Sequence, residues 1–189
     1  MRRLLVSLTL VPALLAAAPA LAETDEQFEE SQCVYEQLSE EDVLVVERAL
    51  SDDPAISAAA EEELSEGFDS AVQACAAVYD WGPDRTSWGG KHAMAIVAYA
   101  QASDDLPAGL APEQVEAVYD ALSEDDRYLF AGPGRKEQDE AWAVRVRAAL
   151  NAGNIAPADQ PAAVFYMLAI ADVQLAGGAW AEIFEKNIP

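Results

Sequence analysis

The sequence predicts an all-α protein, a helical bundle of about six to seven helices held by one disulfide. Alanine is abundant, and apolar residues recur at steps of three and four through most of the chain, as in helices with one buried face. Runs of β-branched residues are few, and no Asn-Gly or Asp-Gly turn joins two alternating segments. The chain also holds only two cysteines, Cys33 and Cys75, which make one pair.

The first 22 residues have the features of a secretory signal peptide in the usual order. Two arginines near the start are followed by an apolar run over about residues 4–18. The run ends in an Ala-Leu-Ala tripeptide, the small-x-small pattern that signal peptidase cleaves, and an acidic stretch follows. A permanent anchor helix is the alternative, but the run is short for a membrane span of ~20 residues. We therefore expect residues 1–22 to be removed.

Cleavage would leave residues 23–189 as a single acidic, all-helical domain, exported to the periplasm or the medium. Its 167 residues match one ordinary domain and suffice to bury a core. The signal carries Arg2 and Arg3 and no acid, so its removal changes the net charge from −23 to −25. Such a charge repels phosphate and anionic lipid, so we expect no nucleic-acid partner. The same charge attracts cations and basic partners.

The charges are unevenly distributed along the chain. Residues 23–84 contain 19 acids and a single base, Arg48, whereas five of the nine bases after residue 22 lie between Arg127 and Arg147. One hypothesis is that this basic segment packs against the acidic N-terminal half. The favoured alternative is that both segments are solvated faces without a common contact.

Cys33 and Cys75 are expected to form a structural disulfide. In an oxidising compartment an isolated pair of cysteines most often forms one bond. The bond would close a loop of ~43 residues, a constraint worth about 4 kcal/mol. The spacing is too wide for a CxxC redox motif, and with one histidine in the chain a Cys/His zinc site lacks ligands. We expect no metal site and no cofactor.

Capping residues and breakers divide the chain into helices. The expected ranges are about 25–38, 39–51, 54–79, 84–102, 112–122 and 136–150, with a short helix over 123–130 and a last one over 158–176. Ser39 and Ser123 lie where N-caps are expected, and Pro54 takes the favoured first position of the long third helix. Gly177 and Gly178 are expected to kink the last helix before a terminal turn.

Residues 161–180 form an apolar stretch of 20 residues with one charge, Asp172. Its length would suit a membrane span. Its alanine and glycine content, together with Gln174, favours a helix that is buried in a soluble bundle. We therefore expect no stable membrane span after signal cleavage.

Two nine-residue segments, 34–42 and 118–126, resemble each other. Their sequences are VYEQLSEED and VYDALSEDD, which are identical at six of nine positions. Each segment precedes a longer helix, and an alanine-rich helix follows in each half of the chain. The pattern is consistent with two related units of three or four helices. Chance similarity between two helix–turn–capped-helix sequences is the alternative left open.

Residues 81–92, which we call the 81–92 segment, are the most distinctive stretch. The segment contains Trp81, Arg85, Trp88, Lys91 and His92, the last being the only histidine of the chain. Its tryptophans and its arginine would suit a small anionic or sugar-like ligand, and a helix start would add N–H groups for an anion. The favoured interpretation is a loop whose tryptophans close one end of the bundle.

A triad of Ser87, His92 and Asp84 is the catalytic alternative within this segment. Ser87 and His92 are five positions apart, which is not one face of a helix, so the triad is disfavoured. Asp84 fits better as a helix cap. Pairs of adjacent acids elsewhere lie at helix boundaries, and none has the spacing of an EF-hand loop.

The sequence therefore favours a non-catalytic exported protein of unknown activity, which binds a partner or contributes to the cell envelope. This prediction rests mainly on the lack of a recognisable catalytic constellation. The alternatives are an exported hydrolase-like enzyme and a small-ligand or cation-binding protein, each using the 81–92 segment. The sequence does not identify the partner, protein or small molecule.

Overall fold

The computed structural model describes residues 25–49, 54–132 and 134–185, and these residues form an all-helical structure. Its elements, in chain order, are α1 (Asp25–Gln37), α2 (Glu40–Ala49), α3 (Pro54–Tyr79), α4 (Pro83–Asp104), α5 (Pro112–Asp120), α6 (Glu124–Tyr128), the 3₁₀-helix η2 (Gly134–Glu137), α7 (Glu140–Ala152) and α8 (Gln160–Glu185). The all-α prediction is confirmed. These eight α-helices exceed the overall estimate of six to seven and correspond one to one to the eight ranges expected along the chain, the break between α5 and the short α6 included. The predicted signal peptide lies outside the described residues.

Two predicted helix boundaries are wrong. α7 begins at Glu140 rather than near residue 136, because Asp139 caps it by accepting a hydrogen bond from the Trp142 backbone N–H at 2.7 Å. The preceding residues form η2 instead. α8 continues through Gly177 and Gly178, where a kink was expected. Packing along α4 compensates for the low helix propensity of the two glycines.

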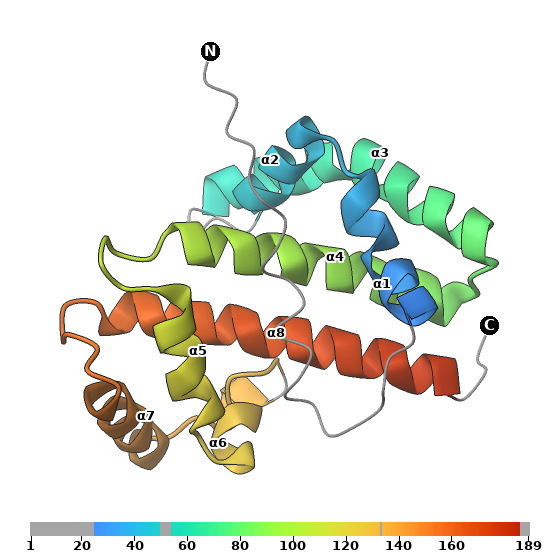
Figure 1. Cartoon of the computed structure of the whole chain (residues 1–189). Coiled ribbons are helices and arrows are strands. Elements are labelled where there is room, and N and C mark those ends of the chain that lie inside the picture. Colours follow the sequence, from blue (N-terminus) through green and yellow to red (C-terminus); the bar gives the residue numbers. More distant parts are fainter. Residues whose placement is uncertain (1–24, 50–53, 133, 186–189) are drawn as a thin grey trace.

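α4 and α8 form the centre of the molecule. They run antiparallel and lie side by side over most of their length (Figure 1). α1 and α3 pack on α4, α2 packs mainly on α3, and α5 packs on α8. α6 and α7 lie on the side of α8 that faces away from α4 (Figure 1). The two long central helices therefore join the first four helices to the last four.

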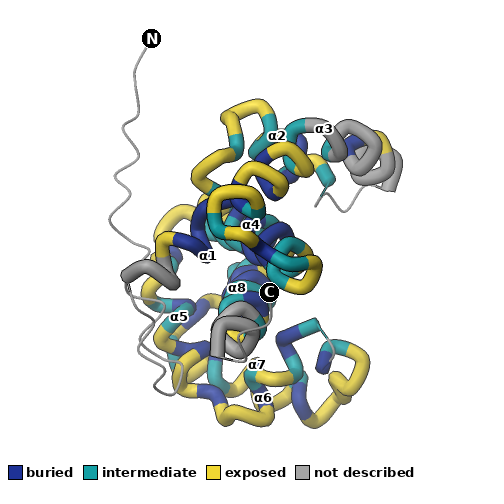
Figure 2. Tube along the Cα trace, turned by 90° about the vertical axis from the view of Figure 1, so that its right-hand side faces the viewer, coloured by how far each residue is buried: buried dark blue, intermediate teal, exposed yellow. Residues whose placement is uncertain are grey.

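The buried apolar side chains fall into two clusters, which we call the larger and the smaller core. The larger core joins the end of α4 to α5–α8, and its biggest fully buried side chains are Tyr119, Phe130, Leu150, Tyr166 and Met167. The smaller core joins α1, α3 and the start of α4, and its buried members are Cys33, Val34, Ala71, Val72, Cys75, Trp81 and Ala93. In Figure 2 the exposed residues of α2 and α6 lie on the outside, while buried residues gather around α4 and α8.

The predicted disulfide is confirmed in the smaller core. Cys33 of α1 and Cys75 of α3 are bonded, with their Cα atoms 6.0 Å apart. Both cysteines are buried, and Cys75 lies on the inward face that the helical spacing predicted for it. The bond thus fixes the first helix to the third.

The two similar nine-residue segments adopt the same local structure. Ser39 and Ser123 each cap a helix: their hydroxyls accept hydrogen bonds from the backbone N–H of Asp42 (3.2 Å) and Asp126 (3.1 Å). Each hydroxyl also donates to the carboxylate of the same aspartate. Each segment joins the first helix of a run of four to the second, and the fourth helices of the runs, α4 and α8, pack together. This correspondence supports the interpretation of two related four-helix units.

The basic residues between positions 127 and 147 include two that form ion pairs within the C-terminal half. Arg135 pairs with Asp172 at 2.6 Å, and Arg145 pairs with Asp126 at 2.7 Å. Arg135 also donates a hydrogen bond to the Phe130 carbonyl. For these two arginines, the hypothesis of packing against the acidic N-terminal half is therefore wrong.

The apolar stretch noted in the sequence lies in α8. Among the described helices, α8 is long and apolar enough over Gln160–Ala179 to cross a membrane, and 39% of its most apolar window is buried inside the structure. Its inward residues, among them Tyr166, Met167 and Ile170, belong to the larger core. Core packing accounts for part of this composition, and the absence of a membrane span stays a prediction.

Candidate functional site

The 81–92 segment forms a short loop and the first turns of α4. The helix begins at Pro83, and the N-cap residue is Gly82, which has an extended backbone and no side chain to cap with. The expectation that Asp84 caps this helix is therefore wrong. Asp84 lies in the first turn instead, where its charge is favourable to the helix dipole. The Thr86 hydroxyl donates to the Gly82 carbonyl at 2.9 Å and steadies the start of the helix.

Trp81 and Arg85 contact α1 and help to hold it against the start of α4. Trp81 is 8% exposed, and its indole N–H donates to Oε1 of Glu30, a residue of α1. Arg85 places Nη1 3.6 Å from the same carboxylate oxygen. The Trp81 ring also stacks on Tyr79, with the ring centroids 6.1 Å apart. A buried carboxylate needs such partners, because an ion without them is costly in the interior.

His92 is also turned inward, toward α1. It is 5% exposed, and its Nδ1 lies 3.0 Å from the backbone carbonyl oxygen of Ser31. A carbonyl can only accept, so Nδ1 carries the proton in this contact. Burial lowers the pKa of His92, because the interior disfavours the charged ring. Ser87 is exposed while His92 is buried, so the structure does not bring together the disfavoured triad.

Lys91 lies at the surface, and Trp88 beside it packs in part against the smaller core. Lys91 is exposed, Trp88 is partly buried, and the Lys91 ammonium lies 4.2 Å from the centroid of the Trp88 indole. A cation–π contact at an exposed site contributes about 0.5–1 kcal/mol. Of the five residues predicted for ligand binding, the structure therefore directs three to α1 and leaves this pair accessible.

Two tyrosines and a glutamate form a polar cluster that the sequence reasoning missed. Both the Tyr99 hydroxyl of α4 and the Tyr166 hydroxyl of α8 lie within hydrogen-bond distance of Glu116 Oε1 in α5, at 2.8 and 2.7 Å. The two hydroxyls are 2.6 Å apart. Burial is the main cause that raises the pKa of both tyrosines well above the usual range. With both tyrosines neutral, the cluster joins α4, α5 and α8 through its hydrogen bonds.

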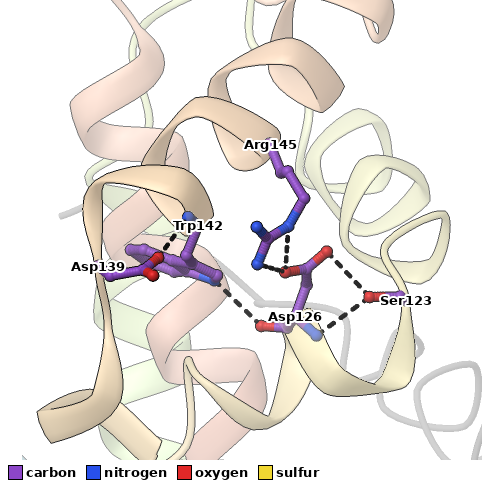
Figure 3. A network of polar contacts seen from close by, with 5 residues as sticks. All are labelled: Ser123, Asp126, Asp139, Trp142 and Arg145. Atoms are coloured by element: carbon purple, nitrogen blue, oxygen red, sulfur yellow. Dashed lines mark hydrogen bonds and ion pairs between the residues drawn. The ribbon is translucent and has the colours of Figure 1, made fainter.

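A second missed network centres on Asp126, a buried aspartate that is 7% exposed (Figure 3). Its Oδ1 accepts hydrogen bonds from Nε and Nη2 of Arg145 at 2.9 and 2.7 Å, while Oδ2 accepts from the Ser123 hydroxyl. The Trp142 indole N–H donates to the Asp126 carbonyl at 3.3 Å. The contacts of Arg145 and Trp142 join α6 to α7, and the Ser123 contact completes the N-cap of α6. The network therefore has a structural role.

Asp126→Asn should lower the free energy of unfolding by about 1 kcal/mol at pH 7, because it removes charged hydrogen bonds whose arginine is half exposed and screened. The hydrogen bond from Arg145 is the main cause that lowers the pKa of Asp126. Its contribution is therefore present above the ordinary pKa of 3.8 and is lost as the pH falls through the lower folded-state value. Urea unfolding at pH 7 and at acidic pH measures the difference between the two proteins.

The matched control for that prediction is Asp125→Asn, since Asp125 is the exposed neighbour in the same helix. It should change stability little at either pH. A stability gap between wild type and Asp126→Asn that stays constant down to acidic pH would contradict the role assigned to the Asp126 charge.

The described residues contain no group of three or more His, Cys, Asp or Glu side chains that could hold a metal ion. A surface depression on α7 is lined by Asp139, Glu140, Ala141, Val144 and Arg145. It lies at the opposite end of the molecule from the start of α4 (Figure 1). The expectation that the chain binds no metal or cofactor stays a prediction.

Fold and contacts together define a disulfide-containing all-α bundle whose conspicuous polar groups fasten helices to one another. No family model, curated protein or solved structure significantly matches the chain.

Proposed function

We propose that the chain is an exported, non-catalytic helical protein that acts by binding a partner, in the periplasm, at the envelope or in the medium. One observation carries this proposal: three of the five candidate residues of the 81–92 segment contact α1. Trp81 and Arg85 contact Glu30, and His92 contacts the Ser31 carbonyl. A hydrolase would need this histidine beside a nucleophile and a substrate, with a proton free to move. A histidine buried against a helix carbonyl suits a structural role better.

Trp88 and Lys91 are the members of the segment that we assign to partner contact. Tryptophan is among the residues that most often dominate the energy of a protein–protein interface. The indole beside an exposed ammonium can stack on an apolar group while the cation meets an acid. This pair is thus the part of the predicted site that a partner can reach.

The test is a capture experiment with the exported chain, immobilised and exposed to the envelope fraction of its source. We expect at least one partner whose affinity falls about tenfold or more for Trp88→Ala/Lys91→Ala, as for loss of an interface tryptophan. The matched control is Lys136→Ala, which removes an exposed lysine on η2 and should leave capture unchanged. Equal capture by all three proteins would contradict the assignment of this pair.

Two further results would replace the proposal by its alternatives. Turnover of ester, peptide or glycoside substrates that is lost in His92→Asn would establish the hydrolase-like enzyme. A rise in melting temperature with millimolar calcium would establish cation binding, because a ligand that binds the folded state stabilises it.

A further inference from the structure

A short stretch of α1, residues 30–34, makes several of its described contacts with the rest of the molecule. Glu30 contacts Trp81 and Arg85, Ser31 contacts His92, Cys33 is bonded to Cys75, and Val34 is fully buried. The disulfide fixes α1 to α3 covalently, whereas the contacts to α4 are non-covalent. Of the latter groups, a histidine is the one whose charge ordinarily changes between pH 5 and 8.

The position of the His92 ring makes a second proton unfavourable. Nδ1 already donates to the Ser31 carbonyl, so the added proton would go to Nε2. Nε2 faces α8 at Gly177, where a Cβ built on the glycine would lie 3.8 Å from it. The junction of α1, α4 and α8 would then contain a buried cation. Burial is the larger cause and lowers the pKa of His92, while the hydrogen bond to the Ser31 carbonyl raises it in part.

Three charged groups on the described parts of α1 and α4 have contacts of their own. The Glu30 carboxylate of α1 receives the Trp81 indole N–H and faces Arg85. On α4, Arg85 lies two turns before His92, and the Lys91 ammonium lies over the Trp88 ring. Neither cation would stabilise an imidazolium, because like charges repel.

Several ionisable groups on the other neighbouring helices have contacts of their own among the residues whose side chains the structure describes. On the described part of α8, Asp172 pairs with Arg135 and the Tyr166 hydroxyl bonds to Glu116 and Tyr99. On α3, Cys75 is in the disulfide, and Tyr79 stacks on Trp81. The group that faces Nε2 from α8 is Gly177, which has no side chain to accept a proton or to donate one.

We propose that His92 is an acid-sensitive latch, which holds α1 against α4 and α8 while its ring is neutral and releases it when the ring is protonated. The Cys33–Cys75 bond keeps the released helix attached to α3. Release uncovers the side of the smaller core that Val34 and Trp81 occupy. Acid thus opens one defined face of the bundle without unfolding the larger core.

The direction of the pH effect on opening follows from the linkage between protonation of His92 and opening. The pKa of His92 is lower in the closed state than its unperturbed value of 6.5. The closed state is therefore fully favoured above pH 6.5, and this preference is lost as the pH falls below 6.5. Between pH 7.5 and pH 5.0 the equilibrium constant for opening should therefore rise, by at most about 30-fold for one histidine. Hydrogen exchange of the α1 amides, corrected for the intrinsic pH dependence of exchange, measures this equilibrium constant for opening.

The decisive variant is His92→Asn, because an asparagine amide can still donate to the Ser31 carbonyl and does not titrate in this range. We expect the acid-induced rise in α1 exchange in the wild-type protein and its loss in the variant. The amides of α7 provide the internal reference and should show no such rise. An equal rise in both proteins, or no rise in either, would overturn the proposal.

A second measurement needs no variant and covers the case in which His92→Asn does not fold. The chain has one histidine, so the imidazole signals in an NMR pH titration of a protein without a histidine tag belong to His92 alone. We expect the ring of the closed protein to titrate below 6.5. A measured value of 6.5 or higher in the folded protein would exclude the latch.

Discussion

Replacing both cysteines, in Cys33→Ala/Cys75→Ala, is expected to lower the free energy of unfolding by about 4 kcal/mol. The bond joins residues separated by 42 positions, so its loss gives the unfolded chain a large gain in conformational entropy. Typical domains are stable by only about 5–15 kcal/mol, so this loss is a large share of the total. Denaturant unfolding of the wild-type and double-variant proteins gives the difference directly.

The wild-type protein after reduction is the control for that substitution. Both cysteines are buried, so alanine also removes a little packing in the smaller core. The reduced protein keeps both sulfur atoms and should show most of the same destabilisation if chain entropy is the cause. A loss below about 1 kcal/mol in both proteins would contradict that account, because the loop-closure term alone is several times larger.

The parts of the fold that were correctly predicted depend on local chemistry. The bounds of α3 follow from Pro54 at its first position and from the loop residues after Tyr79, which cannot continue a helix. The disulfide follows from there being one possible pair in the chain. Ser39 and Ser123 act as caps where the sequence placed them, because capping depends on residues three positions away.

The parts that were missed depend on residues distant in the sequence. Trp81 meets Glu30 across 51 positions, and Tyr166 meets Glu116 across 50, so no local pattern could show either contact. Likewise α8 continues through Gly177, because its packing on α4 outweighs the helix-propensity cost of about 1 kcal/mol per glycine. In the 81–92 segment, residue types suggested a ligand site, whereas tertiary contacts direct Trp81, Arg85 and His92 to α1.

Phe130→Ala is expected to lower the free energy of unfolding by about 3–5 kcal/mol, the usual cost of emptying a large aromatic site in a core. Phe130 is fully buried in the larger core. Its ring meets Tyr119 and Trp142 edge to face, with centroid distances of 5.8 and 5.0 Å. Each such pair adds about 0.5–1.5 kcal/mol beyond burial, and alanine would remove both.

Two substitutions separate this aromatic packing from a general effect of losing a ring. Phe130→Leu fills most of the volume and should cost clearly less, while Phe165→Ala removes a phenylalanine that is half exposed on α8 and should cost under about 1 kcal/mol. Near-ultraviolet circular dichroism should also lose the contribution of Trp142 in Phe130→Ala, because its ring would no longer be held edge to face. If Phe130→Ala and Phe165→Ala were equally mild, α5, α6 and α7 would have to be held on α8 by contacts other than this aromatic cluster.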